Sequence, residues 1–94
     1  MNDFNNNPKQ KTFNEISGCI TDFINGEKYC SLTLSVGHEN LRLVNLSVKK
    51  ELFSKIESIH KIGDMVTCLF FLSSNRKGEK WFTNANILDV IYLR

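Results

Sequence analysis

A single switch in hydrophobic periodicity limits the folds open to this chain. From residue 13 onward, apolar and polar residues alternate over short segments, as they do in half-buried β-strands. Only over residues 48–59 do apolar residues recur at helical spacing, with Val48, Leu52 and Ile56 on one side. The sequence therefore predicts one helix within a series of strands.

Three strands are expected before the helix, over residues 13–24, 27–36 and 41–47. The second strand alternates most regularly, and one of its faces carries Cys30, Leu32, Leu34 and Val36. Asn25-Gly26 separates the first two strands and predicts a tight hairpin, because both residues tolerate positive φ. In the third strand, we expect Leu41 and Leu43 to lie opposite Arg42 and Val44.

Two strands are expected after the helix, over residues 65–73 and 80–92, with a polar, basic loop at residues 74–79 between them. Trp81 and Phe82 are adjacent in the last strand and must point to opposite faces, so we expect one in the core and the other free. Ser47 is the expected N-cap of the helix.

This element order predicts a mainly β protein with an OB-fold, a five-stranded Greek-key barrel whose helix lies between strands three and four. A smaller SH3-type barrel is the alternative, but it is shorter and normally lacks this helix. A ferredoxin-like fold needs two crossover helices. We expect residues 13–94 to form one OB-fold domain, and the asparagine-rich residues 1–12 to form a flexible tail.

Sequence motifs for catalysis are missing from the chain. It has no glycine-rich phosphate loop, HExxH or GxSxG motif, so we expect neither an enzyme nor a cofactor. Its three cysteines form no CxxC pair, which argues against a metal site and favours small core residues in a reducing, cytoplasmic setting. They are Cys19, Cys30 and Cys68. Both histidines, His38 and His60, are expected at the surface.

The formal net charge of +2 is small for a protein that holds duplex DNA by charge alone. A nucleic-acid site must therefore depend on where the basic and aromatic residues lie. No apolar run approaches the roughly 20 residues that span a bilayer, so no membrane contact is expected.

The OB-fold predicts where a ligand binds. It crosses strands two and three and is flanked by the loops after strands one and four. Aromatic residues expected to stack on bases in this region are Tyr29, Trp81 and Phe82. Basic residues expected to contact phosphates are Lys28, Arg42, Arg76, Lys77 and Lys80.

Residues 17–91 resemble small single-domain OB-fold proteins of bacteria and their phages, which are similar to bacterial single-stranded-DNA-binding proteins. The resemblance lies in Gly18-Cys19-Ile20, Lys61-Ile62-Gly63-Asp64 and the segment GEKWFTN at residues 78–84. It implies a non-enzymatic protein that binds single-stranded DNA, or RNA, with little sequence preference in replication, recombination or repair.

A protein-interaction or assembly module on the same barrel is the alternative function. The near-neutral charge favours it, as do Phe71 and Trp81, whose faces the pattern leaves open. We also expect a homo-oligomer, because spare apolar side chains on a small barrel favour self-association.

Overall fold

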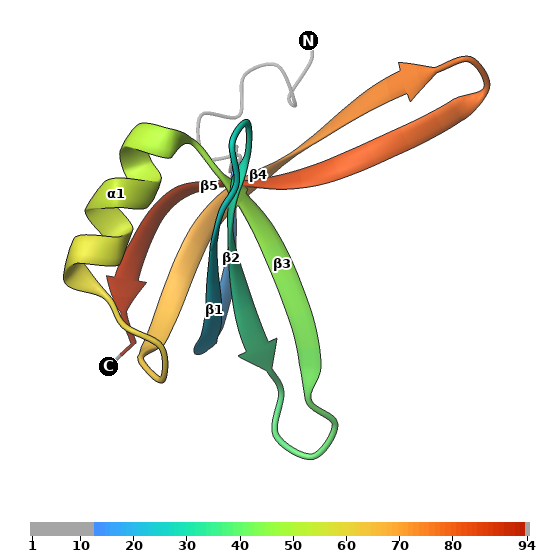
Figure 1. The fold of residues 1–94 in the computed structure, drawn as a ribbon. Helices are drawn as coiled ribbons and strands as arrows, with labels where there is room; N and C mark the ends of the chain where they lie inside the picture. Colours follow the sequence, from blue (N-terminus) through green and yellow to red (C-terminus); the bar gives the residue numbers. More distant parts are fainter. Residues whose placement is uncertain (1–12, 94) are drawn as a thin grey trace, which may run out of the picture.

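The structure, a computed structural model, describes residues 13–93. Its elements are β1 (Asn14–Asn25), β2 (Cys30–Val36), β3 (Arg42–Val48), α1 (Lys50–Ile59), β4 (Met65–Lys77) and β5 (Lys80–Tyr92). The strands close a barrel in the order β1-β2-β3-β5-β4, with α1 between β3 and β4 in sequence (Figure 1). The predicted OB-fold is confirmed. The tail predicted for residues 1–12 lies outside the described residues.

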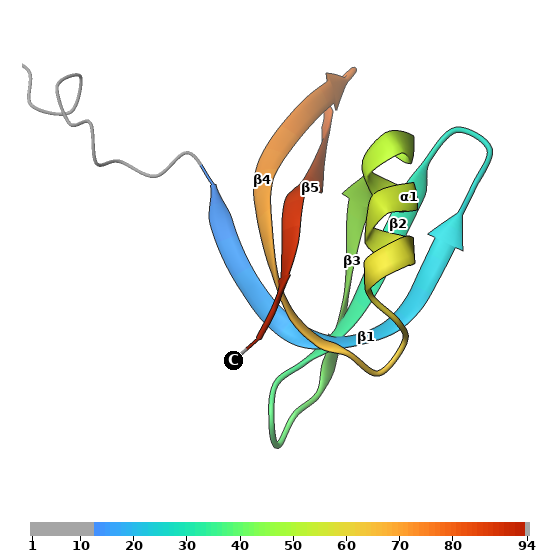
Figure 2. The ribbon, with the colours of Figure 1, turned by 90° about the vertical axis from the view of Figure 1, so that its left-hand side faces the viewer.

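β1 is a long, curved strand that pairs with β4 through its first half and with β2 through its second half (Figure 2). The backbones of β1 and β2 approach closely at Gly18. A Cβ atom on Gly18 would lie 2.6 Å from the carbonyl oxygen of Ser35, closer than real Cβ contacts allow. Only glycine fits this crossing without a backbone shift.

The barrel core follows the alternation predicted for β2. Cys30, Leu32 and Leu34 are each at most 1% exposed. The helix α1 adds Phe53 and Ile56 to this core, both buried. The ring of Phe53 meets that of Phe23 edge to face, with centroids 6.1 Å apart, so α1 is fixed against β1.

The predicted start of the helix is wrong by two residues. β3 continues to Val48, whose side chain is buried in the barrel, and Ser47 pairs with Ser31 across the sheet. The N-cap is therefore Lys49, which makes no side-chain capping hydrogen bond. Strand pairing prevails here over the capping preference of serine.

The tight turn predicted at Asn25-Gly26 is also wrong. Four residues, 26–29, connect β1 to β2, and the amide of Gly26 donates to the carbonyl oxygen of Tyr29 at 3.0 Å. Neither Asn25 nor Gly26 has a positive φ. Tyr29 consequently lies in the loop before β2, with 79% of its surface exposed.

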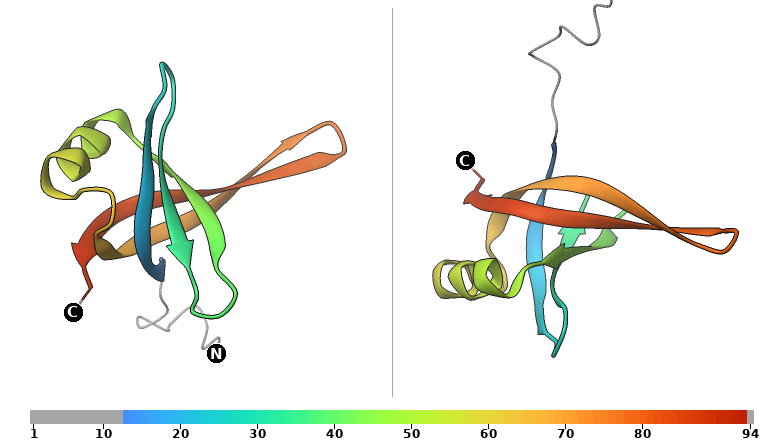
Figure 3. Two further views of the ribbon diagram at one scale, coloured as in Figure 1. Left: turned by 60° about the horizontal axis from the view of Figure 1, so that its bottom comes forward. Right: turned by 90° about the horizontal axis from the view of Figure 1, so that it is seen from above.

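The largest departure from prediction is at residues 74–79, where a loop was expected. The structure instead continues β4 to Lys77, begins β5 at Lys80 and leaves only Gly78-Glu79 as the turn. Gly78 has φ +64°, the conformation that a type II′ hairpin turn requires at its first central position. This hairpin projects from the barrel on the side opposite α1 (Figures 1 and 3).

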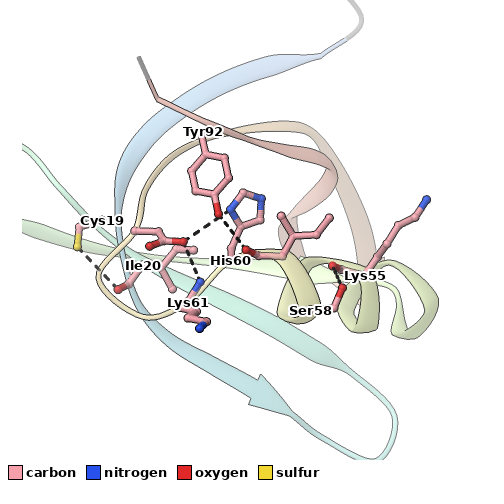
Figure 4. A network of polar contacts seen from close by, with 9 residues as sticks. Cys19, Ile20, Lys55, Ser58, His60, Lys61 and Tyr92 are labelled. Carbon is pink, nitrogen blue, oxygen red and sulfur yellow. Dashed lines mark hydrogen bonds and ion pairs between the residues drawn. The ribbon is translucent and has the colours of Figure 1, made fainter.

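His60 is buried, although a surface position was expected. It follows α1, and its ring packs against that of Tyr92 with centroids 4.5 Å apart (Figure 4). The Tyr92 hydroxyl donates to the carbonyl oxygen of Ile59 at 2.9 Å, and Asp64 Oδ2 lies 4.0 Å from His60 Nδ1. This cluster joins the end of α1 to the end of β5. His38 lies at the surface, as predicted.

The cysteines follow the prediction for two positions of three. Cys30 and Cys68 are buried in the core, whereas Cys19 is half-buried, and all three are free thiols. Burial raises the pKa of the Cys68 thiol to about 12, because the surrounding apolar residues do not solvate a thiolate. Cys68 is therefore a neutral core residue at physiological pH.

Candidate nucleic-acid interface

The projecting hairpin formed by residues 72–85 of β4 and β5, called the arm below, has two different faces. Cross-strand partners share a face, and successive pairs alternate between faces. The front face carries Ser73, Asn75, Lys77, Lys80, Phe82 and Asn84. The back face carries Leu72, Ser74, Arg76, Trp81, Thr83 and Ala85. Phe82 and Trp81 therefore point to opposite sides of the arm.

The front face of the arm continues the outward face of β3. Asn86, two residues beyond Asn84 and thus on the same face, pairs with Ser47 of β3 and with Phe71 of β4. Ser47 lies on the outward face, since its neighbours Leu46 and Val48 are buried in the barrel. The outward side of β3 and the front of the arm therefore form one side of the molecule.

A cleft of about 610 Å³ opens on this side, where the β1–β2 loop, the start of α1 and the root of the arm meet. The residues that line it are Lys28, Tyr29, Ser47, Val48, Lys49, Lys50, Glu51, Leu52, Phe71, Asn86, Ile87 and Leu88. Three lysines face one glutamate there, around apolar and aromatic side chains. The arrangement suits a ligand that is both anionic and partly apolar.

The outward face of β2 and β3 is polar but uncharged at its centre. The Asn45 amide donates to the hydroxyl oxygens of Ser31 at 3.0 Å and Thr33 at 2.9 Å. Leu43 shares this outward face and is 73% exposed, whereas Val44 is directed toward the core. The third strand thus keeps the predicted alternation and presents Leu43 outward. Arg42, expected in the outward-facing groove, lies instead on the same side of the strand as Val44.

The structure gathers five of the eight predicted site residues on one side. Lys28 and Tyr29 line the cleft, and Lys77, Lys80 and Phe82 lie on the front of the arm. None of the three arm residues makes a side-chain hydrogen bond or ion pair within residues 13–93. Their side chains are exposed to solvent and accessible to a ligand.

The other three predicted residues lie elsewhere. Arg76 and Trp81 are on the back of the arm, with the guanidinium carbon 5.9 Å from the centroid of the Trp81 ring. Arg42 begins β3 at the far end of the strand, opposite Val36. The expectation that Trp81 or Phe82 enters the core is wrong, since they are 64% and 50% exposed on an arm with no core beneath it.

The contribution of Lys49, Lys50, Phe71 and Asn86 to the cleft is not among the sequence-based predictions. Lys49 and Lys50 alternate with Glu51 and Glu57 in the sequence, a pattern typical of a solvated helix face. The alternation of faces along a strand could have indicated the position of Lys49. If β3 extends to Val48, then Ser47 and Lys49 both lie on the outward side. Phe71 and Asn86 pair with each other at the root of the arm, and both line the cleft.

Other classes of site are not found in the described part of the chain. Residues 13–93 contain no group of three or more histidine, cysteine or acidic side chains placed to hold a metal ion. The helix among them is too short to cross a membrane.

No protein-family model and no curated protein matches this sequence. Solved structures do match it. The mitochondrial single-stranded DNA binding protein Rim1 of S. cerevisiae has a TM-score of 0.71 at 13% identity, over 90% of this chain and 96% of that one.

Two other structures show the same likeness. OBody NL8, bound to hen egg-white lysozyme, has a TM-score of 0.63 at 15% identity, over 88% of this chain and 96% of that one. A small single-stranded DNA-binding protein from Streptomyces coelicolor has a TM-score of 0.50 at 9% identity, over 88% and 94%. In fold, this chain is similar to mitochondrial and bacterial single-stranded-DNA-binding proteins over about nine tenths of its length.

Proposed function

We propose that this protein binds single-stranded nucleic acid, DNA in preference to RNA, and catalyses no reaction. One observation carries the proposal: the front of the arm, with Lys77, Lys80 and Phe82, lies on the same side as the cleft with Lys28 and Tyr29. A strand laid along this side meets exposed cations and exposed aromatic rings in turn. The similarity in fold to single-stranded-DNA-binding proteins supports the proposal.

The composition of this side suits single strands better than duplexes. Stacking of one base on an aromatic side chain is worth about 1–3 kcal/mol and needs an unpaired base. The net charge of +2 is too small for a protein that depends on phosphate contacts alone. We expect affinity of modest strength, shared between stacking on Tyr29 and Phe82 and phosphate contacts from the lysines.

Fluorescence anisotropy with a labelled oligothymidine of about 20 nucleotides tests this function. We expect binding at low salt that weakens as salt is raised, with weaker binding to a duplex of the same length. Exchanging Lys77 and Lys80 for glutamine should weaken binding, whereas exchanging Lys55 and Lys61, which lie on and just after α1, should not. If the wild-type protein leaves the anisotropy unchanged at low salt, the proposal is wrong.

The cellular role belongs to the same proposal. Sequence-tolerant binding of single strands fits a part in replication, recombination or repair. Three free thiols support a reducing, cytoplasmic location. A homo-oligomer would multiply a modest site through symmetry.

Assembly with a second copy is a second candidate function, favoured by an exposed apolar patch at the start of β4 and the end of β5. Met65, Ile91 and Leu93 lie there, 48%, 48% and 44% exposed, and the Leu93 amide donates to the Met65 carbonyl oxygen at 3.0 Å. These three side chains carry no charge, so the patch can face its own copy in a two-fold interface. OBody NL8, on the same fold, binds a protein.

Sedimentation velocity tests the assembly candidate. An oligomer that dissociates when Ile91 is exchanged for aspartate supports it, and a wild-type monomer at high concentration refutes it. Because Ile91 lies outside the proposed nucleic-acid surface, the affinity of one protomer for oligothymidine should be unaffected.

A further inference from the structure

We propose that the cleft at the start of α1 is a pocket for one nucleotide of the bound strand, with its phosphate held by Lys49 and Lys50. The inference rests on the proposed function and assigns a role to lysines that sequence periodicity places on a solvated helix face. Its basis is the lining of the cleft, its size and the charges that remain unpaired there.

The charges at the rim favour an anion. Within residues 13–93, no lysine or arginine nitrogen lies within 4.0 Å of a carboxylate oxygen; the only contact of this kind is His60 with Asp64, and neither residue lines the cleft. Lys28, Lys49 and Lys50 therefore have no carboxylate of residues 13–93 within 4.0 Å. Lys50 Nζ donates to the carbonyl oxygen of Glu27 at 3.4 Å, which holds the β1–β2 loop beside the start of α1. Glu51 is the single opposing charge in the lining.

The interior of the cleft suits a nucleobase. Phe71 and Leu52 are half-buried and form apolar walls, and Tyr29 stands exposed at the mouth. Ser47 and Asn86 add hydrogen-bonding groups for a base edge. The Asn86 amide donates to Ser73 Oγ at 2.9 Å, while its carboxamide oxygen accepts no hydrogen bond within residues 13–93.

Size and position limit the occupant. A volume of about 610 Å³ lies within the range of about 300–1,000 Å³ typical of small-ligand sites, which accommodates one nucleotide with solvent. The cleft opens beside Asn86, where the front of the arm begins. A strand on the arm can therefore place one nucleotide in the cleft without leaving this side of the protein.

The salt dependence of binding separates this pocket from the rest of the surface. Each phosphate contact on a single strand contributes about 0.7 to the slope of log affinity against log salt concentration. Because Lys49 and Lys50 hold the same phosphate in this proposal, exchanging both for glutamine should reduce the slope by about 0.7. The matched control exchanges Lys55 and Lys61, also exposed, and should leave the slope unchanged. Equal slopes for both variants, with wild-type binding intact, would overturn the pocket but leave the proposed function standing.

Titration with thymidine monophosphate, followed by NMR, tests the occupant directly. The amide resonances of Ser47, Lys49 and Asn86 should shift, and thymidine or inorganic phosphate alone should shift them less. If these resonances do not respond to the mononucleotide, or respond equally to phosphate alone, the cleft is not a nucleotide pocket. A wild-type protein that binds no single strand would overturn both proposals together.

Discussion

Exchanging Phe82 for alanine removes the only aromatic ring from the front face of the arm. Phe82 is 50% exposed and pairs with Asn75 across the hairpin, so its ring can receive a base on one side. Losing one stacking contact costs about 1–3 kcal/mol. The dissociation constant for oligothymidine should therefore rise about 5-fold to 150-fold. Anisotropy at fixed low salt measures this change.

The matched control is Trp81→Ala, one residue away on the back face. Trp81 is 64% exposed and lies under the Arg76 guanidinium, a cation–π contact worth about 0.5–1 kcal/mol at an exposed site. Losing the Trp81 ring destabilises the arm at least as much as losing the Phe82 ring. If binding depended only on the stability of the arm, Trp81→Ala would therefore bind at least as weakly as Phe82→Ala. We expect Trp81→Ala to bind almost as tightly as the wild type. Equal losses in both variants, or no loss with Phe82→Ala, would refute the assignment of faces.

Three further predictions concern other positions. Gly18→Ala should lower the free energy of unfolding by about 1–3 kcal/mol, because the added Cβ meets the Ser35 carbonyl oxygen at 2.6 Å; an unchanged urea midpoint would contradict this. Anisotropy should show that Arg42→Gln leaves the affinity for oligothymidine nearly unchanged, whereas Lys80→Gln weakens it. If Arg42→Gln weakens binding more than Lys80→Gln does, the site lies toward the far end of β3. For Cys68, the folded-state pKa of about 12 lies above the ordinary 9.0, so the unfolded chain loses this proton first as the pH rises. Its contribution to the free energy of unfolding should fall by about 1.4 kcal/mol per pH unit between these values. Free energies from urea unfolding, plotted against pH, should therefore fall more steeply for the wild type than for Cys68→Ala in this range, and parallel plots would contradict the prediction.

The barrel was predictable because its strands have one buried and one exposed face. In β2, the contrast between Leu32 or Leu34 and the serines and threonine between them specifies both strand and orientation. The period switch after β3 specifies the helix in the same way. The hydrophobic pattern of the sequence indicates which residues are buried, and the buried faces in turn predict the fold.

The arm was not predictable from the same pattern, because both of its faces are exposed. Without a core beneath them, residues 74–79 show no alternation and look like a loop. The faces of Phe82 and Trp81 depend on register, which the Gly78-Glu79 turn fixes through the pairing of Lys77 with Lys80. Likewise, His60 is buried through contact with Tyr92, 32 positions away, which local periodicity does not report.

The back face of the arm stabilises the hairpin, whereas the front face is available to bind a ligand. A two-stranded hairpin is marginally stable in water, so the arm needs contacts of its own beyond the barrel. The back face supplies them: Ser74 and Thr83 share a hydrogen bond of 2.8 Å, and Arg76 both donates to the Gly78 carbonyl oxygen at 2.7 Å and covers Trp81.

Lys77, Lys80 and Phe82, on the front face, have no such partners within residues 13–93. Side chains already engaged with each other must break those contacts before they bind a ligand, whereas the front-face groups lose only solvent. This difference favours the front face for nucleic acid and makes Trp81, the aromatic residue with the greatest stacking area, a stabiliser of the arm.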